Sequence, residues 1–275
     1  MGNHQPMKHD ITQHIVHDVC RDISLSLKCM RKSLHDEDIH DFRVQVKQLR
    51  AFLRMASLDK NCRRRIRVPA SIRRIYRKAG RLRDMQLFEE KAASYFADKK
   101  RPEHFFILLK KDKYACERSL KKALDKISSS FSAKPVVRKF PAGFRPISAS
   151  YFFDEKINMI KRLLARKDIT VQVLHCIRKN VKDLQYIKNC SFAYAGSPDT
   201  IFFSKYQSFM NTENLAIQLG QFNDTCMLID FLNSYRFHPF VYPDFEQVEH
   251  FRQQGMYEKE MMRISLNNQL IDMFM

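Results

Sequence analysis

The chain is poor in turn-forming residues, with only 6 Gly and 9 Pro among its 275 residues, and it has no tryptophan. Leu, Lys, Arg and Met are abundant instead, and this combination favours an all-α protein. A hydrophobic share of 44% is enough for a substantial core. The length allows one large domain or two of ordinary size.

Membrane and export signals are also missing. No apolar run reaches the ~20 residues that a membrane span requires. The first ten residues, MGNHQPMKHD, contain neither the apolar region of a signal peptide nor the Ser or Thr of a myristoylation site. We therefore expect no membrane span and a location in the cytoplasm.

Motifs for catalysis and for metal binding are absent from the sequence. There is no P-loop, no G-x-S-x-G and no C-x-x-C frame for zinc. The seven cysteines fall mostly in helical patterns, which predicts buried free thiols in a reducing compartment. His14 and His17 lie one helical turn apart without a third ligand, which favours a surface pair over a metal site. We expect no catalytic residue, no metal and no cofactor.

Positive charge is present in large excess. Lys and Arg number 49 against 30 Asp and Glu, a formal net charge of +19. A surplus of this size destabilises the compact state by self-repulsion and attracts polyanions. The candidate partners are nucleic acid, polyphosphate and an anionic membrane surface.

The segment IHDFRVQVKQLRAFLR, residues 39–54, places part of this charge on one helical face. Steps of 3, 4, 3 and 4 confine five cations to an arc of roughly 80° on a helix, namely His40, Arg43, Lys47, Arg50 and Arg54. An apolar stripe runs beside them, formed by Ile39, Phe42, Val46, Leu49 and Leu53. A basic row bordered by apolar rows predicts the lining of a shared, partly desolvated groove.

The same pattern occurs a second time, in LHCIRKNVKDLQY at residues 174–186. It aligns with residues 39–51 without a gap and pairs His40 with His175, Arg43 with Arg178, and Lys47 with Lys182. Repetition half a chain apart indicates an internal duplication. Duplication predicts a pseudo-twofold axis, with the two H-x-x-R helices meeting near it.

The two H-x-x-R helices resemble the motif of the CHAD domain, the conserved-histidine α-helical domain, which reads V-H-D-x-R-V-x-x-R-R-L-R. The Leu-Arg-Asp at residues 82–84 is similar to the same family's next helix, and the resemblance covers nearly the whole chain. It implies a non-enzymatic protein that binds inorganic polyphosphate in a basic pore between two helical bundles. Polyphosphate granules are the second location that it implies.

The chain order predicts eight helices in two four-helix units of one all-α, CHAD-like domain. The first repeat spans residues 1–128 and the second 148–275, joined by a basic Ser/Pro linker at 129–147. The H-x-x-R helices are expected at 39–57 and 170–190. A long helix is expected from Ser197-Pro198 to Tyr235, and Asp244 with Gln247 resembles a capping box for the last helix.

A second basic row follows the cluster Arg63, Arg64, Arg65 and Arg67, on a helix that begins after Pro69. It consists of Arg73, Arg77 and Arg81, and it faces either the first row or solvent. Gly80 and Asp84 on this helix match Gly220 and Asp224 in the second half, so we expect close helix–helix approach at each glycine. The two aspartates either form a catalytic pair, orient neighbouring cations or cap helix contacts.

These rows predict a polyphosphate-binding site of His40, Arg43, Lys47, Arg50, Arg54, Arg73, Arg77, Arg81, His175, Arg178 and Lys182. The two histidines either donate to phosphate or are hydrogen-bonded within the core. Five first-half arginines lack a basic counterpart in the second half, which predicts a lopsided site.

Two other functions remain open. One is nucleic-acid binding, against which stand the absence of Trp and the lack of aromatics interleaved with the basic rows. The other is a scaffold that recruits partners to polyphosphate granules through the aromatic segment 235–245.

Overall fold

Nine helices make up the regular structure of the computed structural model in the residues that it describes, which are 7–58, 62, 65–127, 131–139, 147–166, 168–194, 206, 212–234 and 244–274. The helices are α1 (Met7–Lys32), α2 (Asp36–Ala56), α3 (Ala70–Tyr95), α4 (Glu103–Leu124), α5 (Lys134–Val137), α6 (Ile147–Leu164), α7 (Val171–Tyr194), α9 (Glu213–Ser234) and α10 (Phe245–Phe274). No strand occurs in these residues, as predicted for an all-α protein.

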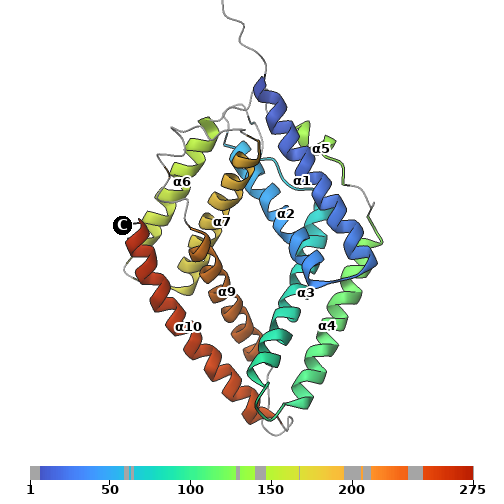
Figure 1. Ribbon diagram of the computed structural model, residues 1–275, viewed down its shortest axis with the longest axis vertical. Coiled ribbons are helices and arrows are strands. Elements are labelled where there is room, and N and C mark those ends of the chain that lie inside the picture. The colour runs from blue at the N-terminus through green and yellow to red at the C-terminus, as the bar shows by residue number, and fades with distance from the viewer. Residues whose placement is uncertain are drawn as a thin grey trace, which may run out of the picture.

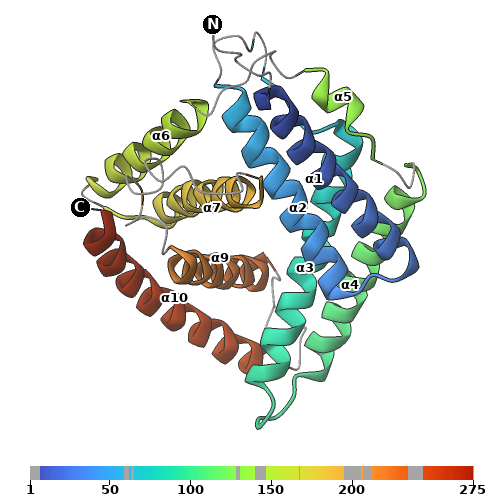
Figure 2. The ribbon, with the colours of Figure 1, turned by 45° about the horizontal axis from the view of Figure 1, so that its top comes forward.

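Four inner helices form a closed frame around the centre of the molecule (Figure 1). Helix α2 packs on α3 and on α7, and α9 packs on the same two helices from the other side. Helices α1 and α4 cover the frame on one side, and α6 and α10 cover it on the other. The rotated view in Figure 2 shows the same arrangement, with α7 and α9 lying between α10 and the α2–α3 pair. The frame therefore brings the two H-x-x-R helices into contact.

Apolar periodicity explains why these helices form and how they face. The predicted stripe of α2 is buried in full, from Ile39, Phe42, Val46 and Leu49 at 0% exposure to Leu53 at 2%. The apolar side of α3 is buried as well. Because both stripes belong to one core cluster with α1, α6 and α7, burial of these faces fixes which face of α2 is left for its cations.

A second apolar cluster joins the two halves at the end of the frame far from α5. First-half aromatics such as Phe88, Phe105 and Phe106 pack there with Leu232 and Phe251 of the second half. The side chain of Asp244 adds a polar link, because its Oδ2 accepts hydrogen bonds from the N–H groups of His104 at 2.6 Å and Phe105 at 3.1 Å.

The prediction of a capping box at the start of α10 is therefore wrong. Asp244 caps the first turn of α4, in the other half, and the Oε1 of Gln247 is buried without a hydrogen-bond partner in the described residues. The sequence could show the capping chemistry but not which helix start lies nearest to the carboxylate.

The predicted long helix is also shorter than expected. Helix α9 begins at Glu213, after the non-helical Thr212, so no single helix runs from 197 to 235, while Ser197 and Pro198 lie outside the described residues. The Ser/Pro linker contains the four-residue α5, whose Val136 is buried in the core cluster. That helix raises the number from the predicted eight to nine in the described part of the chain.

The thiols are less buried than their helical pattern suggested. Six described cysteines are free, but only Cys20 is buried, while Cys29 and Cys176 are exposed. His14 and His17 are both exposed, and the described residues contain no group of three or more His, Cys, Asp or Glu able to hold a metal. Among the described helices, none combines the length and the apolar character needed to cross a membrane.

Candidate functional site

Four duplicated cations converge where α2 meets α7. Arg43 and Lys47 come from α2, and Arg178 and Lys182 come from α7; together we call them the central cluster. Burial and the charges of Arg43, Arg178 and Lys182 together lower the pKa of Lys47 from its ordinary 10.5 to about 8. Burial and the nearby Arg178 also lower the pKa of Lys182. The predicted groove lining is thus partly desolvated and strongly positive.

Two carboxylates from the other inner helices face this cluster. Burial raises the pKa of Asp84 on α3, and the charge of Asp224 on α9 raises it further, while Arg43 and Lys47 oppose the shift. Asp224 in turn supports the charged form of Lys47. Each of the four inner helices therefore contributes a charged group to the centre. This arrangement fits the interpretation of the two aspartates as groups that orient cations.

Gly80 makes room for one of these cations. A Cβ built on Gly80 would collide with Nη1 of Arg43 and lie 3.4 Å from its Cζ. The close approach predicted at this glycine is present, but it is made by a side chain and not by the neighbouring helix backbone. At Gly220 a Cβ would meet nothing within 4 Å, so the predicted close approach there is wrong.

Two tyrosines that the sequence analysis did not select border the central cluster. The guanidinium carbons of Arg43 and Arg50 each lie 5.3 Å from the ring centroid of Tyr76. Burial raises the pKa of Tyr186 on α7 to about 12, with Tyr76 among the neighbours that raise it. Tyr76 lies four residues before Gly80 and so on the same face of α3. This spacing is the feature of the sequence that could have identified Tyr76 as a neighbour of the cluster. The expectation that no aromatic lies between the basic residues is therefore wrong.

The two motif histidines lie at the edge of the cluster, and neither is buried in the apolar core. Burial lowers the pKa of His40, and the charges of Arg83 and Lys47 lower it further. The pKa of His175 is also lowered, mainly by burial. Its Nδ1 lies 2.9 Å from Oδ1 of Asn223, whose Nδ2 donates to Asp224 at 3.3 Å.

One buried donor of the cluster has no partner. The Nε of Arg178 is buried, and it makes no hydrogen bond within the described residues. Leaving a buried charged donor unpaired is costly, and such groups are rare in native structures. A ligand oxygen at this position would satisfy it.

Arg54, the last cation of the α2 row, is already paired. Its Nε donates to Oδ2 of Asp183 on α7 at 3.0 Å, and its Nη2 donates to Oδ1 of the same carboxylate. Lys156 of α6 lies 3.3 Å from that Oδ2. Asp183 thus neutralises charge at one end of the row and links the two halves.

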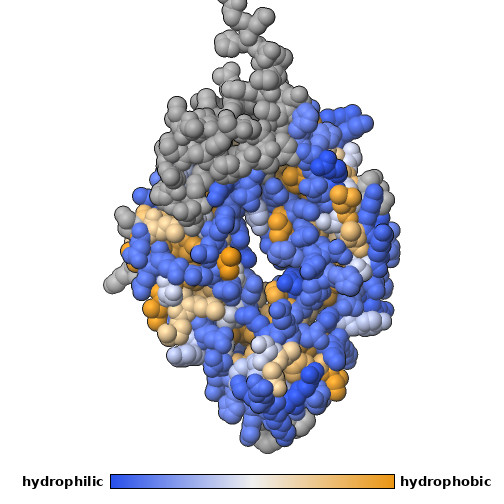
Figure 3. Space-filling view, in the orientation of Figure 1, coloured by the Kyte–Doolittle hydropathy of each residue, from blue (hydrophilic) through white to orange (hydrophobic). Residues whose placement is uncertain are grey.

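The three arginines of the α3 row are exposed and diverge from one another. Arg73 lines a recess next to Arg50 and Arg54, whereas Arg81 lines a cleft between α3, α4 and α9. Arg77 is not among the main charges that act on Lys47 or on Asp84 at the centre. Figure 3 shows a hollow at the centre of the molecule, between the halves, with mostly hydrophilic residues around it.

A family model for the CHAD domain matches residues 21–233 of this chain. The chain belongs to the CHAD domain family. The helix order, the two H-x-x-R helices and the cations on them are thus parts of a CHAD domain.

The fold of this CHAD domain is similar to a solved relative, the CHAD domain from the plant Ricinus communis. The two share 15% sequence identity with a TM-score of 0.69, over 95% of this chain and 91% of the plant chain. At this identity the likeness supports the fold alone. No curated protein matches the chain.

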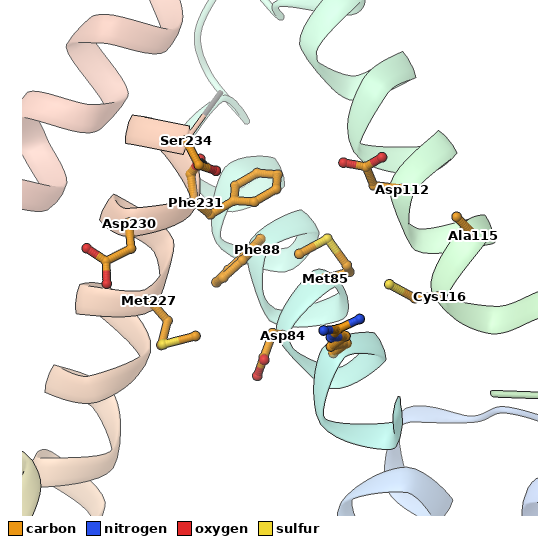
Figure 4. Close-up of a pocket in the computed structure, with 11 residues that line it drawn as sticks. Asp84, Met85, Phe88, Asp112, Ala115, Cys116, Met227, Asp230, Phe231 and Ser234 are labelled. Carbon is orange, nitrogen blue, oxygen red and sulfur yellow. Dashed lines mark hydrogen bonds between the residues drawn. The ribbon is translucent and has the colours of Figure 1, made fainter. Parts of the chain in front are cut away.

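The CHAD domain also has a hollow of a different character, shown in Figure 4. This cleft of about 460 Å³ lies between α3, α4 and α9, and its floor is largely apolar, with Met85, Phe88 and Phe231. Asp84, Asp112 and Asp230 are among its lining residues. Its acidic and apolar lining makes it a poor place for a polyanion, so the central cluster is the better candidate site.

Proposed function

We propose that this CHAD domain binds inorganic polyphosphate at the central cluster, without catalysing a reaction. The observation that carries the proposal is the state of Lys47, a largely buried ammonium in the field of Arg43, Arg178 and Lys182, with a pKa of about 8. Among the described residues, Asp224 and Asp84 act against this positive charge, and the four cations of the central cluster outnumber them. A bound polyanion would supply the missing negative charge.

The shape of inorganic polyphosphate suits this arrangement. A linear phosphate chain carries negative charge at every repeat, and the cations of α2 follow one another along the helix. Arginine presents a planar fork of donors to phosphate oxygens, while lysine provides a point charge. The unpaired Nε of Arg178 and the exposed His40 and His175 are further donors for the chain. The phosphate chain would pass through the hollow between the halves, which would serve as the pore.

Nucleic acid is the second candidate, and Tyr76 is the observation in its favour. Single-stranded nucleic acid binds through cations and through stacking of bases on aromatic rings. The Tyr76 ring, however, already has Arg43 and Arg50 each 5.3 Å from its centroid, which leaves little of its surface for a base. We therefore place polyphosphate first.

The scaffold alternative depends on the segment 235–245, of which only Asp244 and Phe245 are among the described residues. The described hydrogen bonds of the Asp244 carboxylate are made within the chain, to the start of α4. The cytoplasm, with polyphosphate granules as the place of accumulation, remains the expected location under the proposed function.

Competition binding at physiological salt tests the proposal. Labelled long-chain polyphosphate is bound to the protein and displaced by unlabelled polyphosphate, single-stranded RNA or duplex DNA, matched for phosphate count. We expect polyphosphate to displace the label at much lower concentration than either nucleic acid. If RNA displaces the label equally well, the protein binds polyanions in general or nucleic acid, and the proposal is wrong. If the labelled polyphosphate does not bind at all, the proposal is also wrong.

A further inference from the structure

A recess of about 210 Å³ lies where α2 ends and α3 begins, beside the central cluster. Its lining includes five arginines, namely Arg50, Arg54, Arg65, Arg67 and Arg73. The remaining lining residues are Leu53, Ile66 and Val68, so no acidic residue is among the described residues that form it. We call it the arginine recess.

The core holds two of these arginines in place. Ile66 and Val68 are each 4% exposed and alternate with Arg65 and Arg67, whose side chains are exposed. The N–H of Ile66 donates to Oγ of Ser57 at 3.0 Å. An anchored, extended segment therefore directs both guanidinium groups away from the core, which reduces the entropy lost when they bind a ligand.

The start of α3 adds to the positive potential of the arginine recess. Pro69 is the N-cap of α3 and offers no side-chain hydrogen bond, and the first turn contains no acidic residue. The start of a helix carries a partial positive charge, which stabilises anions and not cations. Arg73 nevertheless lies near this end of α3. The sequence thus places a cation where the backbone already favours a negative charge.

Most of this charge has no acidic partner among the residues that the structure describes. Arg54 is paired with Asp183, as described above. For Arg50, Arg65, Arg67 and Arg73, no acidic partner is found in the described part of the chain. Four arginines around one small recess repel one another, and an anion with several charges would relieve that repulsion.

We infer that the arginine recess binds a terminal phosphate group, either at the end of a polyphosphate chain or on a free short oligophosphate. A terminal phosphate has three non-bridging oxygens and up to two negative charges, whereas an internal phosphate has two such oxygens and one charge. Several guanidinium forks, next to a helix start that its N-cap residue Pro69 does not cap, match the terminal group better. Arg50 joins the recess to the Tyr76 side of the central cluster.

The recognition of chain ends rests on the proposed polyphosphate function, whereas the binding of a short oligophosphate does not. Tripolyphosphate is therefore the first probe. The recess variant is Arg65→Ala plus Arg67→Ala, since neither residue belongs to the central cluster. The matched control is Lys110→Ala plus Lys111→Ala, which removes two exposed cations from α4. Circular dichroism verifies the fold, and Arg65→Gln plus Arg67→Gln replaces the recess variant if it is misfolded.

We expect the recess variant to bind tripolyphosphate at least tenfold more weakly than the parent, and the control to change less than threefold. Arg178→Ala plus Lys182→Ala should largely keep tripolyphosphate binding. Equal affinity of the parent and the recess variant, or equal losses in recess variant and control, would overturn the inference.

Long-chain polyphosphate with blocked ends is the second probe. Blocking the ends should weaken binding to the parent by severalfold and have no effect on the recess variant. If blocking has no effect on the parent, the recess does not bind chain ends. If tripolyphosphate binds at the recess but no long chain binds at all, the proposed function fails while the short oligophosphate site stands.

Discussion

The guanidinium of Arg43 occupies the space beside Gly80 in which any other residue would place its Cβ. Helix α3 therefore leaves room for a cation of α2 at the centre of the protein. The matching glycine of the second half, Gly220, has no neighbour within 4 Å of a built Cβ. One sequence feature, repeated in both halves, thus makes room for a cation in only one of them.

Gly80→Ala should weaken polyphosphate binding by roughly tenfold, about the worth of one charge-assisted contact. The added methyl displaces Arg43 from its place next to Tyr76 and Lys47. Because the displaced atoms are the far end of a flexible side chain, the free energy of unfolding should not fall. Isothermal titration and thermal unfolding measure the two effects separately, and an unchanged affinity would show that the position of Arg43 is irrelevant.

Gly220→Ala is the matched control for that variant. It adds a methyl group where space is open and replaces glycine within a helix, so we expect stability to rise by about 0.5–1 kcal/mol. Polyphosphate affinity should not change. The close helix–helix approach expected at Gly220 from the sequence is not present in this structure. A loss of stability in Gly220→Ala would reverse this conclusion.

The four cations of the central cluster should not contribute equally. Arg43→Ala plus Lys47→Ala should weaken polyphosphate binding clearly more than Arg178→Ala plus Lys182→Ala. In the first pair, Arg43 lies beside the ring of Tyr76, which Arg50 also approaches, and Lys47 is largely buried. Titration of folded variants at one salt concentration tests this. Equal losses would indicate a symmetric pore.

The lowered pKa of Lys47 predicts how stability changes with pH. Its folded-state pKa of about 8 is below the ordinary 10.5, so between these values the unfolded chain binds more protons than the folded one. Stability should therefore rise as pH increases through this window, by about 2 kcal/mol from pH 7 to 9.5 for this residue. Denaturant unfolding at each pH gives the free energy of unfolding of the parent and of Lys47→Met. The difference between the two proteins should increase by this amount across the window. Parallel curves for the two proteins would contradict it.

Binding should show the opposite pH dependence. At pH 9.5 the Lys47 amine of the free protein is mostly neutral, so it must take up a proton from solvent when polyphosphate binds, and the affinity falls. Lys47→Arg keeps its charge at this pH and should lose most of this dependence. Equal pH profiles for the two proteins would mean that Lys47 does not contact the ligand.

The link between Arg54 and Asp183 should matter more for stability than for binding. Asp183→Ala leaves Arg54 and Lys156 without their shared carboxylate, and Asp183 is only 9% exposed. We expect a loss of about 1–3 kcal/mol in unfolding free energy, below the range for a fully buried pair because Arg54 is 28% exposed. Arg54→Ala should cost less, since Lys156 still neutralises Asp183. A large loss of polyphosphate affinity in Arg54→Ala, with stability retained, would instead assign Arg54 to the ligand.

Polyphosphate binding should be strongly salt-dependent. If four phosphates are neutralised by the central cluster, a fourfold rise in salt should lower the affinity roughly fifty-fold, by analogy with single-stranded nucleic acid. The slope of the log–log plot should decrease in each double variant of the cluster. An affinity that does not change between low and physiological salt would mean that the central cluster does not neutralise the phosphates of the ligand.

Most of the helices and the faces that they bury could be predicted from the sequence, although not the short α5 or the start of α9. Apolar residues spaced by three and four are buried wherever the helix packs on a core, so the stripe of α2 and its basic row followed from spacing. The duplicated motif identified Arg43, Lys47, Arg178 and Lys182 as a set. Local chemistry suffices for such conclusions because each depends on one helix at a time.

Which groups from different helices meet depends on how the helices pack, and spacing along the chain does not show it. Asp244 is next to α10 in sequence but caps α4, because the carboxylate bonds to whichever free helix start lies within reach. Arg54 belongs to the basic row by spacing but pairs with Asp183, a residue of the other half. Gly80 and Gly220 look equivalent in sequence and differ because one faces Arg43 and the other faces open space. Hydrogen bonds, charge pairs and steric contact act over a few ångströms, and packing alone sets those distances between segments far apart in the chain.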